Sequence, residues 1–474
     1  MGHRRGTLAK LVTPALAAHT HAARTAQDVH AEILALVVEH QGLIDSERRP
    51  FRPGRTLVPW AGRVYDEAEV VAAVEASLEF WLTAGRWARR LEHGLATVIG
   101  HDTCRLVNSG SSANLLATAA LTSPLLGDRR LRRGDEVLTV ATGFPTTVAP
   151  AVQQGLIPVF VDVDPRTANV DVTRLEDAVS DRTRAVILAH TLGNPFDIDA
   201  VLDLCARHDL FLIEDNCDAL GSTYTSVRGD EPVTRATGSF GDLATSSFYP
   251  AHHITTGEGG AVYVTDPTLE RAVTSLRDWG RDCWCDPGKS NTCGQRFEHC
   301  FANLPSGYDH KYVYSHFGYN LKMTDLQAAV GVRQLEKLDT FTALRRRNHA
   351  YLSERLAAHD DVLQLPIATE RSDPSWFGYL LVVRPDAGFT RDALVARLED
   401  RRIQTRMLFA GNVIAQPMFD DMRSSGEGYR VAGPLEGSDA LMRGALLVGC
   451  FPGLTIEHLD YVADTISDFI AGRA

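Results

Sequence analysis

The 474-residue sequence contains very little lysine. It has 48 basic residues, but only five of them are lysines: Lys10, Lys289, Lys311, Lys322 and Lys337. A GC-rich genome that favours arginine codons accounts for this bias. The bias still has a chemical consequence, because residues 11–288 contain no lysine amine. Any reaction that needs such an amine in that stretch is excluded.

The sequence also lacks an excess of positive charge and a long apolar run. Its formal net charge is -12, whereas proteins that bind nucleic acids or anionic membranes carry basic surfaces. No apolar run approaches the roughly 20 residues that cross a bilayer. We therefore expect neither a nucleic-acid partner nor a membrane. Eight cysteines in so long a chain are no disulfide framework, and we expect a reduced, cytoplasmic location.

Short apolar segments that alternate with helical stretches indicate an α/β fold. The clearest expected strands are residues 137–141, 157–163, 185–189, 210–213 and 261–264. Such alternation is typical of a mostly parallel sheet with helices on both faces. The C-terminal third repeats the pattern on a smaller scale, with expected strands at residues 376–383 and 445–448.

The chain is long enough for two structural domains. We expect an N-terminal helical segment at residues 1–56, a large domain at 57–335 and a small C-terminal α/β domain at 336–474. A second helix is expected at residues 70–82. Residues 277–319 are rich in Gly, Cys, Asp, Tyr and His. Long irregular insertions of this kind are usually functional or disordered, and the dense aromatic and cysteine residues favour a function.

Two segments carry the features of an anion site and of an acidic site. Residues 108–114 include Gly110, Ser111 and Ser112 before an apolar helix, so their N–H groups and hydroxyls could surround a phosphate. Plain helix capping is the alternative. Asp215 stands at the end of a predicted buried strand, where ligands lie in open α/β sheets. Its carboxylate could keep a pyridinium nitrogen protonated, or could cap a following helix.

A third segment, residues 246–260, follows a predicted strand and ends in a Gly-rich turn. The three segments together resemble the DegT/StrS family of nucleotide-sugar aminotransferases, whose fold is aspartate-aminotransferase-like (fold type I), with a large mixed, mostly parallel sheet and a smaller C-terminal α/β domain. In that family a lysine three residues before the pair equivalent to Thr255 and Thr256 binds pyridoxal phosphate covalently. Here His252 occupies that position. Imidazole cannot make the same bond, so the resemblance implies a pyridoxamine or pyridoxal phosphate that is held noncovalently.

With a histidine at this position, the chain resembles the NDP-4-keto-6-deoxyhexose 3-dehydrases. The resemblance extends over about residues 57–469. It implies an enzyme that removes the 3-hydroxyl of an NDP-4-keto-6-deoxyhexose. His252 would move the proton, because imidazole exchanges protons near neutral pH, and Asp215 would stabilise charge at the ring nitrogen. An external reductase, or a ferredoxin- or flavodoxin-type donor, would supply electrons.

The cysteine spacing matches the iron–sulfur members of this group. Cys283, Cys285 and Cys293 are spaced like three cysteines of those members. A [2Fe-2S] centre takes four thiolates, and the resemblance implies that Cys217 is the fourth ligand. Cys300 is a rival for that place. Zinc is the alternative metal, although paired C-x₂-C knuckles do not occur. The interval between Cys217 and Cys283 is longer than the corresponding interval in those members. Extra residues in the polar stretch 225–237 would account for the difference.

The resemblance also implies the remaining contacts. Phe144 would stack on the cofactor ring, with a plain core aromatic as its alternative, and Asp218 would lie near that ring. Ser247 would bind the phosphate together with Ser111, and Asn320 would reach it from the second subunit of a homodimer.

The substrate would contact Tyr249 and Arg406. Arg406 would bind the diphosphate, because a guanidinium donates paired hydrogen bonds to such oxygens. Three alternatives remain: a dehydratase without a cluster, a sugar aminotransferase, and a degenerate family member that only binds or regulates.

Overall fold

The computed structural model describes residues 24–283, 285, 288–301 and 303–472. The chain divides into two units, Met1–Arg48 and Arg49–Ala474. The first contains α1 (Ala26–Ser46), which begins with a capping box between Thr25 and Asp28. The expected N-terminal helix is therefore present in the described part of residues 1–56. None of the helices in the described ranges has the length and apolar character needed to cross a bilayer.

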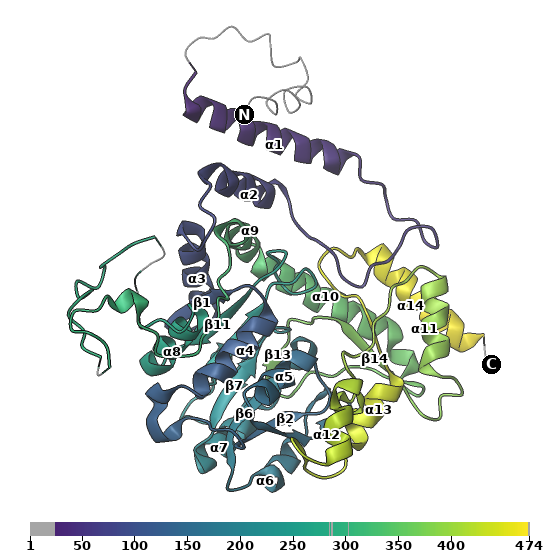
Figure 1. The fold of residues 1–474 in the computed structure, drawn as a ribbon. Coiled ribbons are helices and arrows are strands. Elements are labelled where there is room, and N and C mark those ends of the chain that lie inside the picture. The colour runs from purple at the N-terminus through teal and green to yellow at the C-terminus, as the bar shows by residue number, and fades with distance from the viewer. Residues whose placement is uncertain (1–23, 284, 286–287, 302, 473–474) are drawn as a thin grey trace. The chain divides into compact units, whose positions relative to one another are not determined.

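The second unit contains an eight-stranded mixed sheet (Figure 1). Its order is β1 (Thr103–Val107), β11 (Gly260–Val264), β10 (Leu243–Ser247), β7 (Phe211–Asp215), β6 (Thr183–Ala189), β2 (Glu136–Val140), β3 (Ile157–Val161) and β15 (Arg430–Val431). Only β11 runs antiparallel to its neighbours β1 and β10. The other pairs are parallel, which confirms the expected mixed, mostly parallel sheet.

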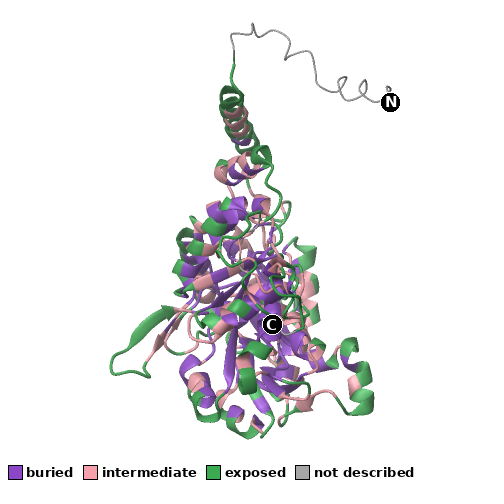
Figure 2. Ribbon diagram, turned by 60° about the vertical axis from the view of Figure 1, so that its left-hand side comes forward, coloured by how far each residue is buried: buried purple, intermediate pink, exposed green. Residues whose placement is uncertain are grey.

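The central strands are buried on both faces, as a parallel sheet between helices requires. In β6, Ala185 and Ile187 pack in one cluster with α4 (Gly110–Leu121) and α8 (Pro267–Arg277). The intervening Val186 and Leu188 pack in another with α7 (Ile198–His208). Figure 2 shows this burial along the strands. A third cluster joins α3 (Arg86–Ile99) and α9 (Asp325–Leu335) to β1 and β11.

The C-terminal third builds a second, antiparallel sheet. Its order is β12 (Leu363–Gln364), β14 (Tyr379–Val383) and β16 (Ala445–Val448). A core of its own joins this sheet to α10 (Leu338–Leu356), α11 (Arg391–Asp400) and α14 (Ile456–Ala471). The predicted domain boundary at residue 335 coincides with the end of α9, and the division into these domains stays a prediction.

Two local differences from the sequence expectations have clear causes. The second helix is α2 (Glu67–Glu79) instead of residues 70–82, because Asp66 and Glu69 form a capping box and the left-handed Phe80 (φ 54°) ends it. In residues 225–237, β8 (Thr223–Ser226) and β9 (Val233–Ala236) form a hairpin that pairs with β13 (Ser372–Asp373).

The cysteine-rich insertion leaves α8 as a long loop (Figure 1). Its described residues include one short helical turn, η5 (His310–Tyr312). The remaining α-helices and strands of the described residues are α5 (Pro145–Gln153), β4 (Val163–Asp164), β5 (Asn169–Val170), α6 (Leu175–Ala178), α12 (Asp420–Ser425) and α13 (Glu436–Gly444).

Candidate active site

A cavity of about 520 Å³ lies where β7 and β10 end and α4 begins. Its volume suits a small-molecule site. Many of the residues predicted from the sequence line it: Gly110, Ser111, Phe144, Asp215, Cys217, Asp218, Ser247, Tyr249, His252 and Arg406. None of the described residues that line the cavity is a lysine, and His252 is among them.

Asp215 lines this cavity and is only 4% exposed. Asn114 Nδ2 donates to its Oδ2 at 2.8 Å, and Thr147 Oγ1 donates to the same oxygen at 2.7 Å. The backbone N–H of Cys217 donates to Oδ1 at 3.2 Å. These donors hold the carboxylate in one orientation. A carboxylate so held suits a protonated ring nitrogen, so the residues present fit a pyridine cofactor.

The start of α4 provides the anion-binding end of the cavity. Ser109 caps the helix by accepting a hydrogen bond from the Ser112 N–H at 3.0 Å. Ser111 is exposed and donates to Thr146 Oγ1 at 3.0 Å. A Cβ added at Gly110 would lie 2.4 Å from that of Ser247, so a side chain there would fill the space between strand and helix. A helix N-terminus surrounded by serine and threonine hydroxyls fits a phosphate.

His252 follows a tight turn, closed by a 2.9 Å hydrogen bond from its own N–H to the Tyr249 carbonyl. Its ring stacks on Phe377 with centroids 5.1 Å apart. Its Nδ1 lies 3.5 Å from Asp218 Oδ1. Arg345 donates to the His252 carbonyl at 3.1 Å and fixes the turn from below.

Burial changes the proton affinity of this pair. It lowers the pKa of His252 to about 4, although the negative charge of Asp215 opposes the shift. Burial and the same charge raise the pKa of Asp218 to about 8. Both side chains are therefore neutral near pH 7, and the imidazole has a lone pair free to accept a proton.

The open side of the cavity is aromatic and basic. Phe144 and Tyr249 are each 52% exposed, and Phe144 meets Phe409 edge to face with centroids 6.0 Å apart. Arg406 is exposed, with one guanidinium nitrogen 2.7 Å from the Thr405 carbonyl. These side chains are accessible to a ligand that enters from solvent.

Two predicted contacts do not line the cavity. Ser112 turns its hydroxyl to Ser109 Oγ at 3.0 Å. Asn320 is exposed and pairs through its backbone with Asp278. Contact between Asn320 and a second subunit's phosphate stays a prediction.

The insertion brings part of the predicted metal set together. The sulfur atoms of Cys283 and Cys285 and a ring nitrogen of His310 all lie within 4.8 Å of one another. Cys293 Sγ is 3.3 Å from His310 Nε2. This donor set fits a metal centre. Cys217 is not in the group and lines the cofactor cavity, and Cys300 is exposed.

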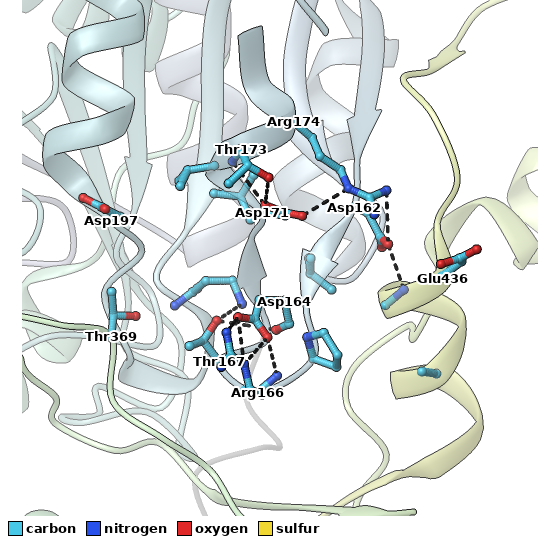
Figure 3. Close-up of a pocket in the computed structure, with 17 residues that line it drawn as sticks. Asp162, Asp164, Arg166, Thr167, Asp171, Thr173, Arg174, Asp197, Thr369 and Glu436 are labelled. Atoms are coloured by element: carbon cyan, nitrogen blue, oxygen red, sulfur yellow. Dashed lines mark hydrogen bonds and ion pairs between the residues drawn. The ribbon is translucent and has the colours of Figure 1, made fainter. Parts of the chain in front are cut away.

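A second hollow of about 640 Å³ lies around β4 and β5 (Figure 3). Its carboxylates bind the protein itself. Asp162 accepts from the backbone N–H groups of Gly437 and Ser438, both at 2.8 Å. Asp164 pairs with Arg166 at 2.7 Å. These bonds hold loops in place, so the first cavity is the better candidate for catalysis.

Sequence reasoning missed several residues that complete the site. Asn114 lies within residues 108–114 but was given no role there, and Thr147 was not singled out. Phe377 and Arg345 carry no local signal, because strand and helix packing alone brings them to His252. His310 lay in the insertion that was already marked as functional.

The comparisons with known proteins agree with this geometry. Residues 64–467 match the DegT/DnrJ/EryC1/StrS aminotransferase family. The chain belongs to this family, and the family and fold expected from the sequence are confirmed.

Among its relatives, the dTDP-4-dehydro-2,6-dideoxy-D-glucose 3-dehydratase of Saccharopolyspora spinosa is 52% identical over 444 residues, which cover 94% of this chain and 93% of the relative. The lipopolysaccharide biosynthesis protein RfbH of Salmonella typhimurium is 49% identical, over 94% of this chain and 99% of that protein. The structure of E. coli GDP-4-keto-6-deoxy-D-mannose-3-dehydratase with bound hydrated PLP aligns with a TM-score of 0.74 and 28% identity, over 86% of this chain and 99% of that one.

Proposed function

We propose that this chain is a nucleotide-sugar 3-dehydratase that removes the 3-hydroxyl of an NDP-4-keto-6-deoxyhexose with pyridoxamine phosphate. The observation that carries the proposal is that His252 lines the same cavity as the oriented Asp215, with no lysine among the described residues that line it. Relatives whose names state a sugar 3-dehydratase support it. An aminotransferase would need the lysine that this cavity lacks.

Each part of the cofactor has a matching group in this chain. Gly110, Ser111 and Ser247 would hold the phosphate at the start of α4, and Phe144 would cover the ring. Asp215 would keep a proton at the ring nitrogen. When bound, pyridoxamine phosphate supplies an amine for the 4-keto carbon and a ring that delocalises an electron pair.

His252 would act as the base. It is neutral near pH 7 because burial lowers its pKa, so it can take a proton from the carbon next to the cofactor ring. Its stack on Phe377 and the Arg345 bond at its carbonyl keep the imidazole at the cavity wall. Loss of the 3-hydroxyl as water would follow this proton transfer.

The open side of the cavity would bind the sugar nucleotide. Arg406 would bind the diphosphate, because a guanidinium can donate two parallel hydrogen bonds to phosphate oxygens. Tyr249 would lie against the sugar. The relatives named above act on dTDP- and GDP-sugars by their names, and both nucleotides belong in the substrate panel.

Replacing a C–O bond by a C–H bond consumes two electrons and two protons and releases water. A [2Fe-2S] centre would pass these electrons singly from an external reductase or a ferredoxin- or flavodoxin-type donor. Cys283, Cys285 and Cys293 would supply thiolates, as their gathering with His310 supports. The fourth ligand predicted from the sequence, Cys217, stays a prediction. So do the homodimer, in which Asn320 would reach the second subunit's phosphate, and the cytoplasmic location.

The test is turnover of anaerobically purified protein with a panel of NDP-4-keto-6-deoxyhexoses, pyridoxamine phosphate and a reductase. We expect a 3-deoxy-4-keto product by mass spectrometry, with one product formed for each electron pair consumed. A 4-amino sugar as the main product would overturn the proposal. Full turnover without reductant, but with glutamate, would instead support a dehydratase without a cluster.

A further inference from the structure

One wall of the active-site cavity is apolar, and the proposed function assigns no part of the substrate to it. Trp60, Phe377 and Leu447 line the cavity there. Their exposed fractions are 9%, 6% and 1%, and all three belong to one hydrophobic cluster. The wall is built by residue 60, by the residues just before β14 and by β16. It therefore comes from other parts of the chain than the cofactor contacts at the ends of β7 and β10.

Trp60 is held in this wall by packing and by its backbone. Its ring meets Phe377 edge to face, with centroids 5.5 Å apart and planes 78° apart. Its backbone N–H donates to Gln404 Oε1 at 3.2 Å. A Cβ added at Gly378 would lie 2.6 Å from the indole ring, so the close approach of ring and chain depends on this glycine. The indole is thus positioned by bonds that need no ligand.

The wall connects the two groups that the proposed function places at different ends of the sugar. Phe377 stacks on the ring of His252, the proposed base. Leu447 pairs through its backbone with Arg406, the proposed diphosphate ligand, by hydrogen bonds of 2.7 and 3.0 Å. Trp60 contacts Phe377 directly. Apolar side chains therefore extend from the base to the arginine.

The chemistry of the proposed substrate indicates which sugar carbon faces this wall. The hydroxyl that leaves is on C3, next to the 4-keto carbon, and the diphosphate is on C1. C2 connects these two positions, whereas the other path around the ring contains the ring oxygen. A 2-hydroxyl against the wall would have no side-chain acceptor, because phenyl and leucine side chains contain no polar atom and an indole N–H only donates. A methylene at C2 would instead be buried favourably.

We infer that Trp60 is a specificity-determining residue, and that the wall of Trp60, Phe377 and Leu447 selects an NDP-4-keto-6-deoxyhexose that already lacks its 2-hydroxyl. The inference rests on the proposed function, which places the sugar between His252 and Arg406. An apolar pocket rejects an added hydroxyl by up to about a hundredfold. The cavity should therefore prefer the 2-deoxy sugar by roughly ten- to a hundredfold.

The experiment measures kcat/KM for two substrates that carry the same nucleotide and differ only at C2. One is an NDP-4-keto-6-deoxyhexose with its 2-hydroxyl, and the other is its 2-deoxy form. The full-length proteins, loaded with pyridoxamine phosphate, are wild type, Trp60→Phe, Trp60→Gln and Trp60→His. Leu57→Gln is the matched control, because Leu57 is 45% exposed and is not among the described residues that line the cavity.

Two features of the design separate specificity from misfolding. The ratio of the two kcat/KM values does not depend on the fraction of active protein, so a partly misfolded variant still reports its preference. The dissociation constants of both sugars, measured by calorimetry on protein without pyridoxamine phosphate, give a second readout that needs no turnover.

We expect wild-type protein and Leu57→Gln to prefer the 2-deoxy sugar roughly ten- to a hundredfold in kcat/KM. Trp60→Phe should keep most of this preference, because a phenyl ring leaves the wall apolar. Trp60→Gln and Trp60→His provide an acceptor for the 2-hydroxyl. They should reduce the preference at least about fivefold, mainly by lowering KM for the 2-hydroxy sugar.

Equal kcat/KM for the two sugars in wild-type protein would overturn the inference and leave the proposed function intact. So would a preference that both polar variants keep unchanged. Wild-type protein that converts neither sugar would contradict the proposed function, and with it the placement of the sugar on which the inference rests.

Discussion

At the scale of residues, the proposed function rests on His252, which lines the cavity together with the oriented Asp215. In that proposal His252 provides a base where the family's aminotransferases would have a lysine, and the amine that would bind the cofactor covalently is missing. Asn114 and Thr147 hold Asp215 in place for the ring nitrogen. One side chain would therefore decide which reaction follows once the cofactor is bound.

Thr147→Val should lower turnover roughly ten- to hundredfold, since a hydrogen bond to a charged group contributes about 1.5–3 kcal/mol. The hydroxyl of Thr147 lies 2.7 Å from Asp215 Oδ2, and without it the carboxylate is held less firmly at the ring nitrogen. We expect kcat to fall while KM for the sugar stays constant. Thr118→Val is the control, because this buried threonine bonds only the Asn114 carbonyl. Equal kcat in both variants would contradict the role of Thr147.

Asp215 could be predicted from the sequence because its place at the end of an apolar strand is a local pattern. Gly110 and Ser111 carry a local pattern too, in their small-residue run before a helix. Phe377 could not be predicted, because its contact with His252 depends on how the C-terminal strands pack on the large sheet. His310 could not be predicted for a related reason, because its contact with Cys293 depends on the path of the loop between them.

At the scale of elements, α10 connects the two sheets' cores and carries several buried polar residues. His349 on α10 stacks on Trp376 with centroids 3.8 Å apart and planes 7° apart. Burial lowers the pKa of His349 to about 3. An unfolded chain binds this proton near pH 6.5, so stability is lost as pH falls from about 6.5 towards 3.

Between pH 7 and pH 5, His349 should therefore remove about 2 kcal/mol from the free energy of unfolding. His349→Phe keeps a flat ring on Trp376 and lacks the titrating group. In urea unfolding, we expect this variant to lose less stability between the two pH values than wild-type protein, by about that amount. His93→Gln, at an exposed position of α3, is the control. Parallel pH curves for all three proteins would contradict the assignment.

The β8–β9 hairpin lies between Cys217 and Cys283, where the sequence predicts that extra residues would lengthen the interval between these cysteines. Residues 227–232 at its tip are exposed, and Ser226 pairs directly with Val233. Replacing the tip with Asn-Gly suits a two-residue hairpin turn. We expect turnover and metal content within about twofold of wild type, as for other surface changes. A loss of metal would show that the hairpin takes part in the centre.

At the scale of the whole molecule, the predicted homodimer would place Asn320 at the cofactor phosphate of the second subunit. It is exposed and lies outside the cavity of its own chain, as a residue that serves a second subunit would be. If so, inactive His252→Asn and Asn320→Ala proteins should complement each other when they are mixed and reassembled.

Random reassembly would restore about a quarter of the sites, because only mixed dimers have one site with both residues intact. The measurement is turnover of the mixture, with light scattering to confirm exchange into dimers. Each variant mixed with itself is the control. No recovery in a sample that has exchanged would contradict a shared site.

The most direct test of the account is His252→Lys. A lysine here should bind pyridoxal phosphate covalently, which borohydride reduction and mass spectrometry of the peptide would show. Dehydration should fall at least about a hundredfold, as expected when a general base is lost. His93→Lys should change neither. A His252→Lys protein that binds the cofactor covalently and still dehydrates at the wild-type rate would contradict the central claim that His252 is the base of this reaction.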